Sequence, residues 1–182
     1  MTQNHYVLLD RDGVINADSD DYIKSPDEWQ PISGSLEAIA LLNQAGFKVA
    51  VLTNQSGLGR GLFDIDTLDA IHAKMRRLLR DKGGEIAGLY YCPHVPDDHC
   101  ACRKPKPGLA QQFSQETGTS LENVFFVGDA FRDIQTALAV GAQPLLVKTG
   151  KGLKTIADHP ELTLPIFDDL YAAAQYILHT GK

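Results

Sequence analysis

The sequence predicts an α/β fold: a doubly wound, Rossmann-like parallel sheet with helices on both faces. Short apolar segments, typical of buried strands, alternate along the chain with segments of helical periodicity. Three of the apolar segments are followed at once, or after one glycine, by a polar residue, namely Asp10, Thr53 and Asp129. Ligands of such sheets bind outside the carboxyl ends of the strands, so we expect these three side chains at one site.

Strands and helices are expected in regular succession. In the first half, strands at residues 6–9 and 48–52 flank a helix at 35–45. Asp64 can cap a long helix that ends near residues 83–84. The second half predicts strands at 86–91, 124–127, 145–147 and 166–167, and helices at 107–117, 133–140 and 170–178.

The composition is that of an ordinary globular domain, 43% hydrophobic and 22% charged, and we expect a single domain over residues 1–182. The formal net charge of −6 argues against nucleic acid as a partner, because non-specific binding needs a basic surface. No apolar run reaches the ~18 residues of a membrane span. The first five residues lack the features of a signal peptide, so we expect a cytoplasmic protein. We also expect a monomer.

Two carboxylates stand two residues apart where the first strand should end, in Asp10-Arg11-Asp12-Gly13. A carboxylate can attack phosphorus and form an aspartyl-phosphate, which splits hydrolysis into two easier steps. A second carboxyl can protonate the leaving group and then activate water. Side chains two residues apart in an extended chain point the same way, so Asp10 and Asp12 can face one pocket. Alone, however, Asp12-Gly13 is more typical of a turn.

Further motifs follow the two carboxylates in order. Each alone has an ordinary structural explanation: a strand-end turn, a solvated lysine or a helix cap. Together with the first motif they resemble the haloacid dehalogenase-like phosphotransferases from end to end. The motifs are Thr53-Asn54-Gln55-Ser56, Lys104-Pro105, and Gly128-Asp129 with Asp133 four residues later.

This resemblance implies roles for the motif residues. Asp10 corresponds to the nucleophile and Asp12 to the general acid and base. Mg²⁺ would be bound by the carboxylates of Asp10 and Asp129 and by the main-chain carbonyl of Asp12. The remaining roles are a hydrogen bond to a phosphoryl oxygen from Thr53, charge stabilisation by Lys104, and orientation of the metal site by Asp133.

All three cysteines lie in the segment 92–102, which predicts a zinc site. Three thiolates and one imidazole complete a tetrahedral zinc site with no open position, so the metal is expected to be structural. An odd number of cysteines in a reducing compartment argues against disulfides. Spacing alone allows either His94 or His99 beside Cys92, Cys100 and Cys102, and the family resemblance selects His94. Such a loop would hold Lys104 in place.

The zinc loop narrows the resemblance to the branch that contains the heptose-1,7-bisphosphate 7-phosphatases and the histidinol-phosphate phosphatases. Ser56 is similar to the heptose side, because the histidinol side usually has Asp there. The short spacing between His94 and Cys100 is shared with the histidinol side, and Ala130 stands where some heptose enzymes have a substrate-contacting Lys. We predict that the chain belongs to the heptose side, and this resemblance implies a role in making ADP-heptose for lipopolysaccharide.

A sugar bisphosphate is therefore the expected small-molecule partner. No large insertion separates the motifs, so we expect no large cap domain, and an open site. The glycine-rich segment 57–61 is expected to be a flexible loop at its rim, and 148–152 a basic surface turn. The expected substrate-binding residues are Asp18, Tyr22, Thr53, Asn54, Gln55, Ser56, Arg103 and Lys104.

Two other classes of protein share some of these features. A phosphoaspartate receiver domain is also doubly wound and uses Asp, Thr and Lys-Pro, but its acidic pair precedes the phosphoacceptor on another strand, and it has no zinc cluster. A non-catalytic zinc-loop interaction protein would not require the motif residues. Another small sugar-phosphate phosphatase, or a histidinol-phosphate phosphatase, is the alternative within the enzyme class.

Overall fold

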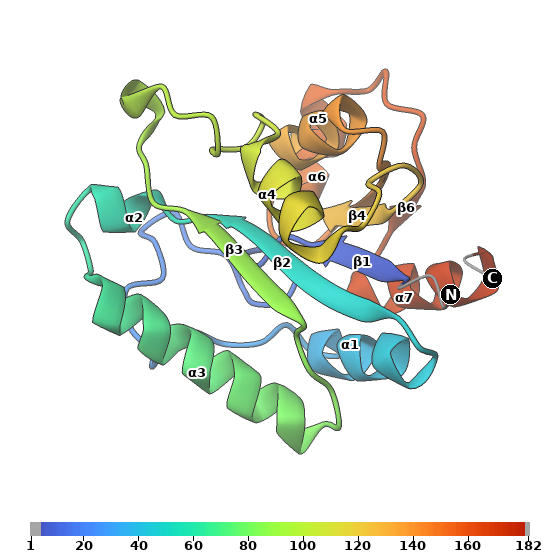
Figure 1. The fold of residues 1–182 in the computed structure, drawn as a ribbon, viewed down its shortest axis with the longest axis horizontal. Helices are drawn as coiled ribbons and strands as arrows, with labels where there is room; N and C mark the ends of the chain where they lie inside the picture. The colour runs from blue at the N-terminus through green and yellow to red at the C-terminus, as the bar shows by residue number, and fades with distance from the viewer. Residues whose placement is uncertain (1–4, 181–182) are drawn as a thin grey trace.

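A computed structural model describes residues 5–180, which form one sheet with helices on both faces (Figure 1). All six strands are parallel, in the order β3-β2-β1-β4-β5-β6, so the predicted doubly wound fold is confirmed. Residues 1–4, on which the expectation about a signal peptide depends, lie outside the described residues. The strands are β1 (Tyr6–Leu9), β2 (Lys48–Asn54), β3 (Gly88–Cys92), β4 (Phe125–Gly128), β5 (Gln143–Val147) and β6 (Ile166–Phe167).

Alternation along β1 divides the core into two layers. Val7 and Leu9 belong to the cluster that α1, α3 and α7 cover, whereas Leu8 belongs to the cluster that α4 and α5 cover. All three side chains are fully buried, as expected for the central strand of a parallel sheet. The helices are α1 (Ser35–Gln44), α3 (Ile65–Asp81), α4 (Gly108–Thr117), α5 (Phe131–Ala139) and α7 (Leu170–Thr180).

Helix α3 shows how local sequence determines an element here. Asp64 is its N-cap, and the Asp64 side chain accepts a hydrogen bond from the main-chain N–H of Thr67 at 2.8 Å. Leu68, Ile71 and Met75 recur at helical spacing and are all buried, and Ile71 and Met75 belong to the core cluster on that face of the sheet. The predicted helix is therefore confirmed, and it lies beneath β2 and β3 in Figure 1.

Two short helices were not predicted from the sequence: α2 (Ser56–Gly59), where a flexible loop was expected, and α6 (Gly152–Asp158), which begins at the end of the expected surface turn. Their glycines lie where a side chain would not fit: a Cβ on Gly59 would be 2.4 Å from the carbonyl oxygen of Pro93, and one on Gly152 would be 1.8 Å from that of Val147. Close packing against distant segments stabilises these turns, so hydrophobic periodicity does not reveal them. A flexible loop at 57–61 was therefore the wrong expectation for its first half.

Among the element ends that differ from prediction, two lie at the site described below. Strand β2 continues to Asn54, because β3 pairs with it as far as Cys92. Helix α5 begins at Phe131, since Asp133 lies in its first turn and accepts a hydrogen bond from the N–H of Ala130 at 3.1 Å. Between β1 and α1, and between β2 and α3, the described chain forms loops and α2, so no large cap domain covers the strand ends there.

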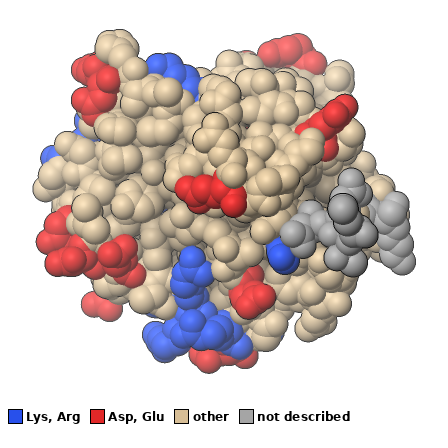
Figure 2. All heavy atoms as spheres, in the orientation of Figure 1, with Lys and Arg blue, Asp and Glu red and all other residues tan. Residues whose placement is uncertain are grey.

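Acidic and basic side chains are interspersed on the face of the molecule seen in Figure 2. Within residues 5–180, no helix is both long enough and apolar enough to cross a lipid bilayer.

Candidate active site

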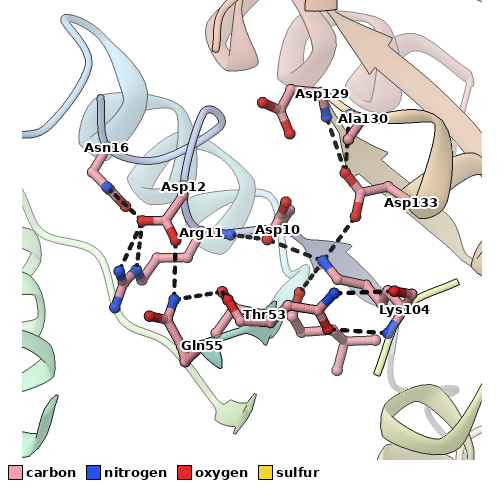
Figure 3. Close-up of polar contacts among 12 residues, drawn as sticks. Asp10, Arg11, Asp12, Asn16, Thr53, Gln55, Lys104, Asp129, Ala130 and Asp133 are labelled. Atoms are coloured by element: carbon pink, nitrogen blue, oxygen red, sulfur yellow. Dashed lines mark hydrogen bonds and ion pairs between the residues drawn. The ribbon is translucent and has the colours of Figure 1, made fainter. Parts of the chain in front are cut away.

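The motif residues lie at the carboxyl ends of three neighbouring strands (Figure 3). Asp10 directly follows β1, Thr53 lies near the end of β2, and Asp129 directly follows β4. Because β1 lies between β2 and β4 in the sheet, these residues share one edge. The sequence predicted that these residues would lie at one site outside the carboxyl ends of the strands, and the structure brings them together there.

The side chain of Lys104 is fully buried beside these strand ends. Its Nζ is 3.0 Å from Asp10 Oδ1 and 2.8 Å from Asp133 Oδ1, and it donates a hydrogen bond to the carbonyl of Leu52 at 2.7 Å. Burial opposes its charge, but the Asp10 and Asp133 carboxylates outweigh burial and hold the pKa of Lys104 above its ordinary value. The lysine is therefore a fixed positive charge beside Asp10.

Asn54 holds the main chain of Lys104. The Lys104 N–H donates to Asn54 Oδ1 at 3.0 Å, and Asn54 Nδ2 donates to the Lys104 carbonyl at 3.1 Å. This double hydrogen bond spans 50 residues of sequence and connects Lys104 directly to the end of β2. The zinc loop was expected to hold Lys104 in place, and the structure shows a more direct anchor.

The Asp12 carboxylate accepts hydrogen bonds from three side chains. Arg11 donates to Oδ1 through Nε at 3.1 Å and Nη2 at 2.8 Å, and Asn16 Nδ2 donates to the same oxygen at 2.9 Å. Gln55 Nε2 donates to Oδ2 at 3.0 Å. Burial raises the pKa of Asp12, but the Arg11 charge and these hydrogen bonds bring it below its ordinary value. Without substrate, Asp12 is a carboxylate at neutral pH.

Gln55 also prepares the Thr53 hydroxyl. Gln55 Nε2 donates to Thr53 Oγ1 at 2.9 Å, so this amide nitrogen has its two hydrogens directed at Asp12 and Thr53. The hydroxyl proton of Thr53 has only a long contact to the Asn54 carbonyl, at 3.5 Å, and can turn to a better-placed oxygen. Thr53 is fully buried and Gln55 nearly so. Gln55 was predicted to bind substrate. Its amide nitrogen donates both of its hydrogens to side chains of the protein itself.

Three carboxylates form a group that can bind a metal ion: Asp10, Asp129 and Asp133 offer ligand oxygens within 4.8 Å of one another. Asp133 is already engaged, because Oδ1 faces Lys104 and Oδ2 accepts from the N–H groups of Asp129 and Ala130. Asp129 Oδ1, by contrast, is buried with neither a hydrogen-bond partner nor an ion pair among the described residues. Asp133 is therefore suited to bracing this site, and Asp10 and Asp129 to binding the cation.

Electrostatics also favour a cation here. Burial, followed by repulsion from neighbouring carboxylates, raises the pKa of Asp10 to about 7 and that of Asp129 to about 8. A divalent cation bound by the carboxylate oxygens of Asp10 and Asp129 would relieve this repulsion. Mg²⁺ prefers oxygen ligands in proteins. The donor atoms present therefore fit Mg²⁺.

The segment 148–152 belongs to the site, so a mere surface turn was the wrong expectation. Lys151 N–H donates to Asp129 Oδ2 at 2.8 Å, and Thr149 Oγ1 donates to the carbonyl of Gly13 at 2.7 Å. A Cβ on Gly13 would lie 2.0 Å from Asp129 Oδ2, and one on Gly150 would lie 2.3 Å from it. Both glycines, at positive φ, leave room for the Asp129 carboxylate.

An open pocket lies above these residues. Of the expected substrate-binding residues, Thr53 and Lys104 lie below the pocket surface, and the others line it together with Asp10 and Asp12. Arg132 was missed, although its place in the first turn of the helix after Asp129 could have indicated it. The further lining residues are Ser19, Asp20, Ile23, Arg60, Arg132 and Lys151.

The zinc ligands predicted from the sequence lie together in the loop after β3. Cys92 Sγ is 3.0 Å from Cys102 Sγ, and Cys100 Sγ is 3.6 Å from each of them. His94 Nδ1 is 3.3 Å from Cys102 Sγ, so His94, rather than His99, completes the group. Three sulfur atoms and one imidazole nitrogen are a donor set that fits structural zinc.

Comparison with known proteins identifies the family. A family model described as HAD-hydrolase-like matches residues 101–173. The D-glycero-beta-D-manno-heptose-1,7-bisphosphate 7-phosphatase of Pseudomonas aeruginosa is 56% identical over 173 residues, which cover 94% of this chain and 97% of that protein. The chain belongs to this phosphatase family. A family member from Neisseria meningitidis is 51% identical over 176 residues, which cover 94% of each chain.

A solved structure of the family agrees with the fold and contains magnesium. The D,D-heptose 1,7-bisphosphate phosphatase from B. bronchiseptica, complexed with magnesium and phosphate, is 49% identical and matches with a TM-score of 0.93. The match covers 96% of this chain and 98% of that one. The predicted haloacid dehalogenase-like fold is therefore confirmed.

Proposed function

We propose that the protein removes the 7-phosphate of D-glycero-β-D-manno-heptose 1,7-bisphosphate, with Asp10 as the nucleophile. The observation that carries this proposal is the Asp10–Lys104–Asp133 group at the strand ends, in a chain 56% identical to a phosphatase of that name. The relatives' names favour the heptose side of the branch over the histidinol-phosphate side. The product, heptose 1-phosphate, would feed synthesis of ADP-heptose for lipopolysaccharide.

In the first step, Asp10 attacks phosphorus and the sugar alkoxide departs, leaving an aspartyl-phosphate. Lys104, already paired with Asp10, stabilises the charge that the carboxylate shares with the phosphoryl group. The hydroxyl proton of Thr53, which has only a 3.5 Å contact to the Asn54 carbonyl, can be donated to a phosphoryl oxygen. When bound by Asp10, Asp129 and the main-chain carbonyl of Asp12, Mg²⁺ supplies further neutralisation of negative charge.

Asp12 acts on both sides of the intermediate. A bound phosphate dianion favours the protonated form of a nearby carboxyl, so Asp12 can take up the proton that it gives to the leaving alkoxide. It is then a carboxylate again and can accept a proton from the water that attacks the aspartyl-phosphate. Hydrogen bonds from Arg11 and Asn16 support the carboxylate form needed in this second step.

The pocket lining supports a bisphosphate as substrate. Arg60, Arg103, Arg132 and Lys151 place cationic side chains around the opening, where a second phosphate can be bound. The experiment is a turnover assay with heptose 1,7-bisphosphate, histidinol phosphate and fructose 1,6-bisphosphate side by side. We expect the highest kcat/KM for heptose bisphosphate. A higher value for histidinol phosphate would contradict the proposed substrate, and no turnover of any of them would contradict phosphatase activity.

We further propose that the protein acts in the cytoplasm as a single domain over residues 1–182. Three free thiols grouped around one imidazole support a reducing compartment, because oxidation would compete with zinc binding. The expectation of a monomer stays a prediction, and light scattering of the purified protein tests it.

A further inference from the structure

Arg11, which is buried, connects the loop that follows β1 and carries Asp10 and Asp12 to helix α3. Arg11 has no solvent exposure, and its guanidinium lies between the side chains of Asp12 and His72. On one side, Nε and Nη2 point to Asp12 Oδ1 (Figure 3). On the other side, Nη1 is 3.0 Å from His72 Nε2, across 61 residues of sequence. The proposed mechanism assigns no role to His72.

The direction of the Arg11–His72 hydrogen bond follows from chemistry. A guanidinium has only donors and does not lose its proton in a protein, so His72 Nε2 must accept. His72 is then neutral, with its proton on Nδ1. Burial and the nearby Arg11 charge lower the pKa of His72 to about 3, in agreement with a neutral ring. His72 is thus a permanent acceptor for Arg11 at neutral pH.

The two oxygens of Asp12 are held unequally as a result. Oδ1 accepts from Arg11 Nε, Arg11 Nη2 and Asn16 Nδ2, whereas within residues 5–180 Oδ2 accepts from Gln55 alone. A carboxylate oxygen with three donors has no lone pair left for a proton. The proton that the proposed mechanism needs can therefore be carried only by Oδ2.

We propose that His72 is a positioning residue: through Arg11 it holds Asp12 so that Oδ2 is the oxygen that protonates the leaving group. The proposal rests on the phosphatase mechanism above and extends it to a residue of α3. If His72 served only to satisfy a buried arginine, its loss would lower stability without any preference among substrates. If it positions Asp12, its loss affects most the substrates whose leaving group needs a proton.

The test compares two leaving groups. A sugar alkoxide is a poor leaving group and needs protonation, whereas p-nitrophenolate is a stable anion and does not. The parameter measured is kcat/KM, which reports steps up to departure of the leaving group and so excludes the later action of Asp12 as a base. The two substrates are heptose 1,7-bisphosphate, or fructose 1,6-bisphosphate if it is turned over, and p-nitrophenyl phosphate.

The variants are His72→Leu, which removes the acceptor, and His72→Gln, which keeps an acceptor oxygen near the position of Nε2. For His72→Leu we expect kcat/KM to fall roughly 10-fold or more with the sugar phosphate, since general acid catalysis contributes ~10²–10⁴-fold. With p-nitrophenyl phosphate it should stay close to that of the unmodified enzyme. His72→Gln should restore most of the rate with the sugar phosphate.

Equal losses with both substrates, or no loss with either, would overturn the positioning role. If His72→Leu does not fold, His72→Asn takes its place, because its shorter polar side chain ends before Arg11. Asp12→Asn is the reference variant. Its kcat/KM should fall more with the sugar phosphate than with p-nitrophenyl phosphate, and by a larger factor than in His72→Leu. If the unmodified enzyme turns over no phosphate monoester, the proposed function fails first, and this inference fails with it.

Discussion

The carboxylate site at the strand ends and the zinc loop at 92–102 are both metal sites, yet they are built in opposite ways. The carboxylate site draws its side chains from segments far apart in sequence, and the ends of parallel strands position them. Asp10, Asp129 and Asp133 are all buried there. The zinc loop draws its four ligands from one short segment, and most of them are half-buried.

The difference shows what each metal contributes. Within the segment 92–102, Cys92 ends β3 and Pro96–Asp98 forms one short turn of 3₁₀ helix, so zinc ligation would add a constraint where regular structure is sparse. At the strand ends the backbone already supplies the geometry, and the cation is needed to neutralise charge. Loss of zinc should therefore change a conformation, whereas loss of Mg²⁺ should change a reaction rate.

Removing the nucleophile should have the largest effect. Asp10→Asn keeps the shape of the side chain, and we expect kcat to fall roughly 10⁴-fold or more. Thermal unfolding should not occur at a lower temperature, because burial and the neighbouring carboxylates disfavour the charge of Asp10 by more than its ion pair with Lys104 favours it. Asp21→Asn, on the exposed rim, is the control. Appreciable turnover by Asp10→Asn would favour direct attack by water.

Chelation should separate the two metals. A mild chelator is expected to stop turnover by removing Mg²⁺, and added Mg²⁺ should restore it, because the strand ends keep their geometry. Zinc should remain bound through the same treatment, since three thiolates and an imidazole hold it. Metal analysis and activity are measured on the same samples. Protein prepared without chelators that contained no zinc would disprove the zinc site.

Asn54→Ala and Cys100→Ser should separate the two supports of the catalytic lysine. Asn54→Ala removes both hydrogen bonds to the Lys104 main chain, so kcat should fall, by up to ~100-fold for a displacement of about 1 Å. Cys100→Ser should release zinc and loosen Arg103, whose Nη1 donates to the carbonyl of His94, so mainly KM should rise.

Zinc content, kcat and KM are measured for both variants, and Asn54→Ala should keep its zinc. An equal fall of kcat in both variants would show that the zinc loop, rather than the end of β2, holds Lys104 in place.

A smaller effect is expected on stability at low pH. The pKa of His72 is about 3 in the folded protein and ~6.5 in an unfolded chain. Below pH ~6.5 the unfolded state binds a proton that the folded state does not, so stability falls as pH falls, by at most ~1.4 kcal/mol per pH unit. His72→Gln lacks this loss. Urea unfolding from pH 7 to pH 5 should therefore show the variant gaining on the unmodified protein, and parallel curves would contradict the assignment.

Local pattern was sufficient for most of the fold. The strand at Tyr6–Leu9 is apolar on both faces, and α3 has a capping Asp64 and an apolar stripe, so each element is visible within its own segment. The ends of β2 and α5 were less accurate, because pairing with β3 and the position of Asp133 decide them. Helices α2 and α6 were missed, since their glycines pack against distant backbone.

The sequence by itself determined the doubly wound sheet, the residues at its strand ends and the zinc ligands up to the choice of histidine. It could do so because strand burial, motif order and ligand spacing are local properties of the chain. Only the tertiary structure decided that Asn54 anchors Lys104, that Lys151 supports Asp129, and that His72 braces Arg11. These contacts join residues 22 to 61 positions apart, and the packing of separate elements, rather than any local pattern, brings them together.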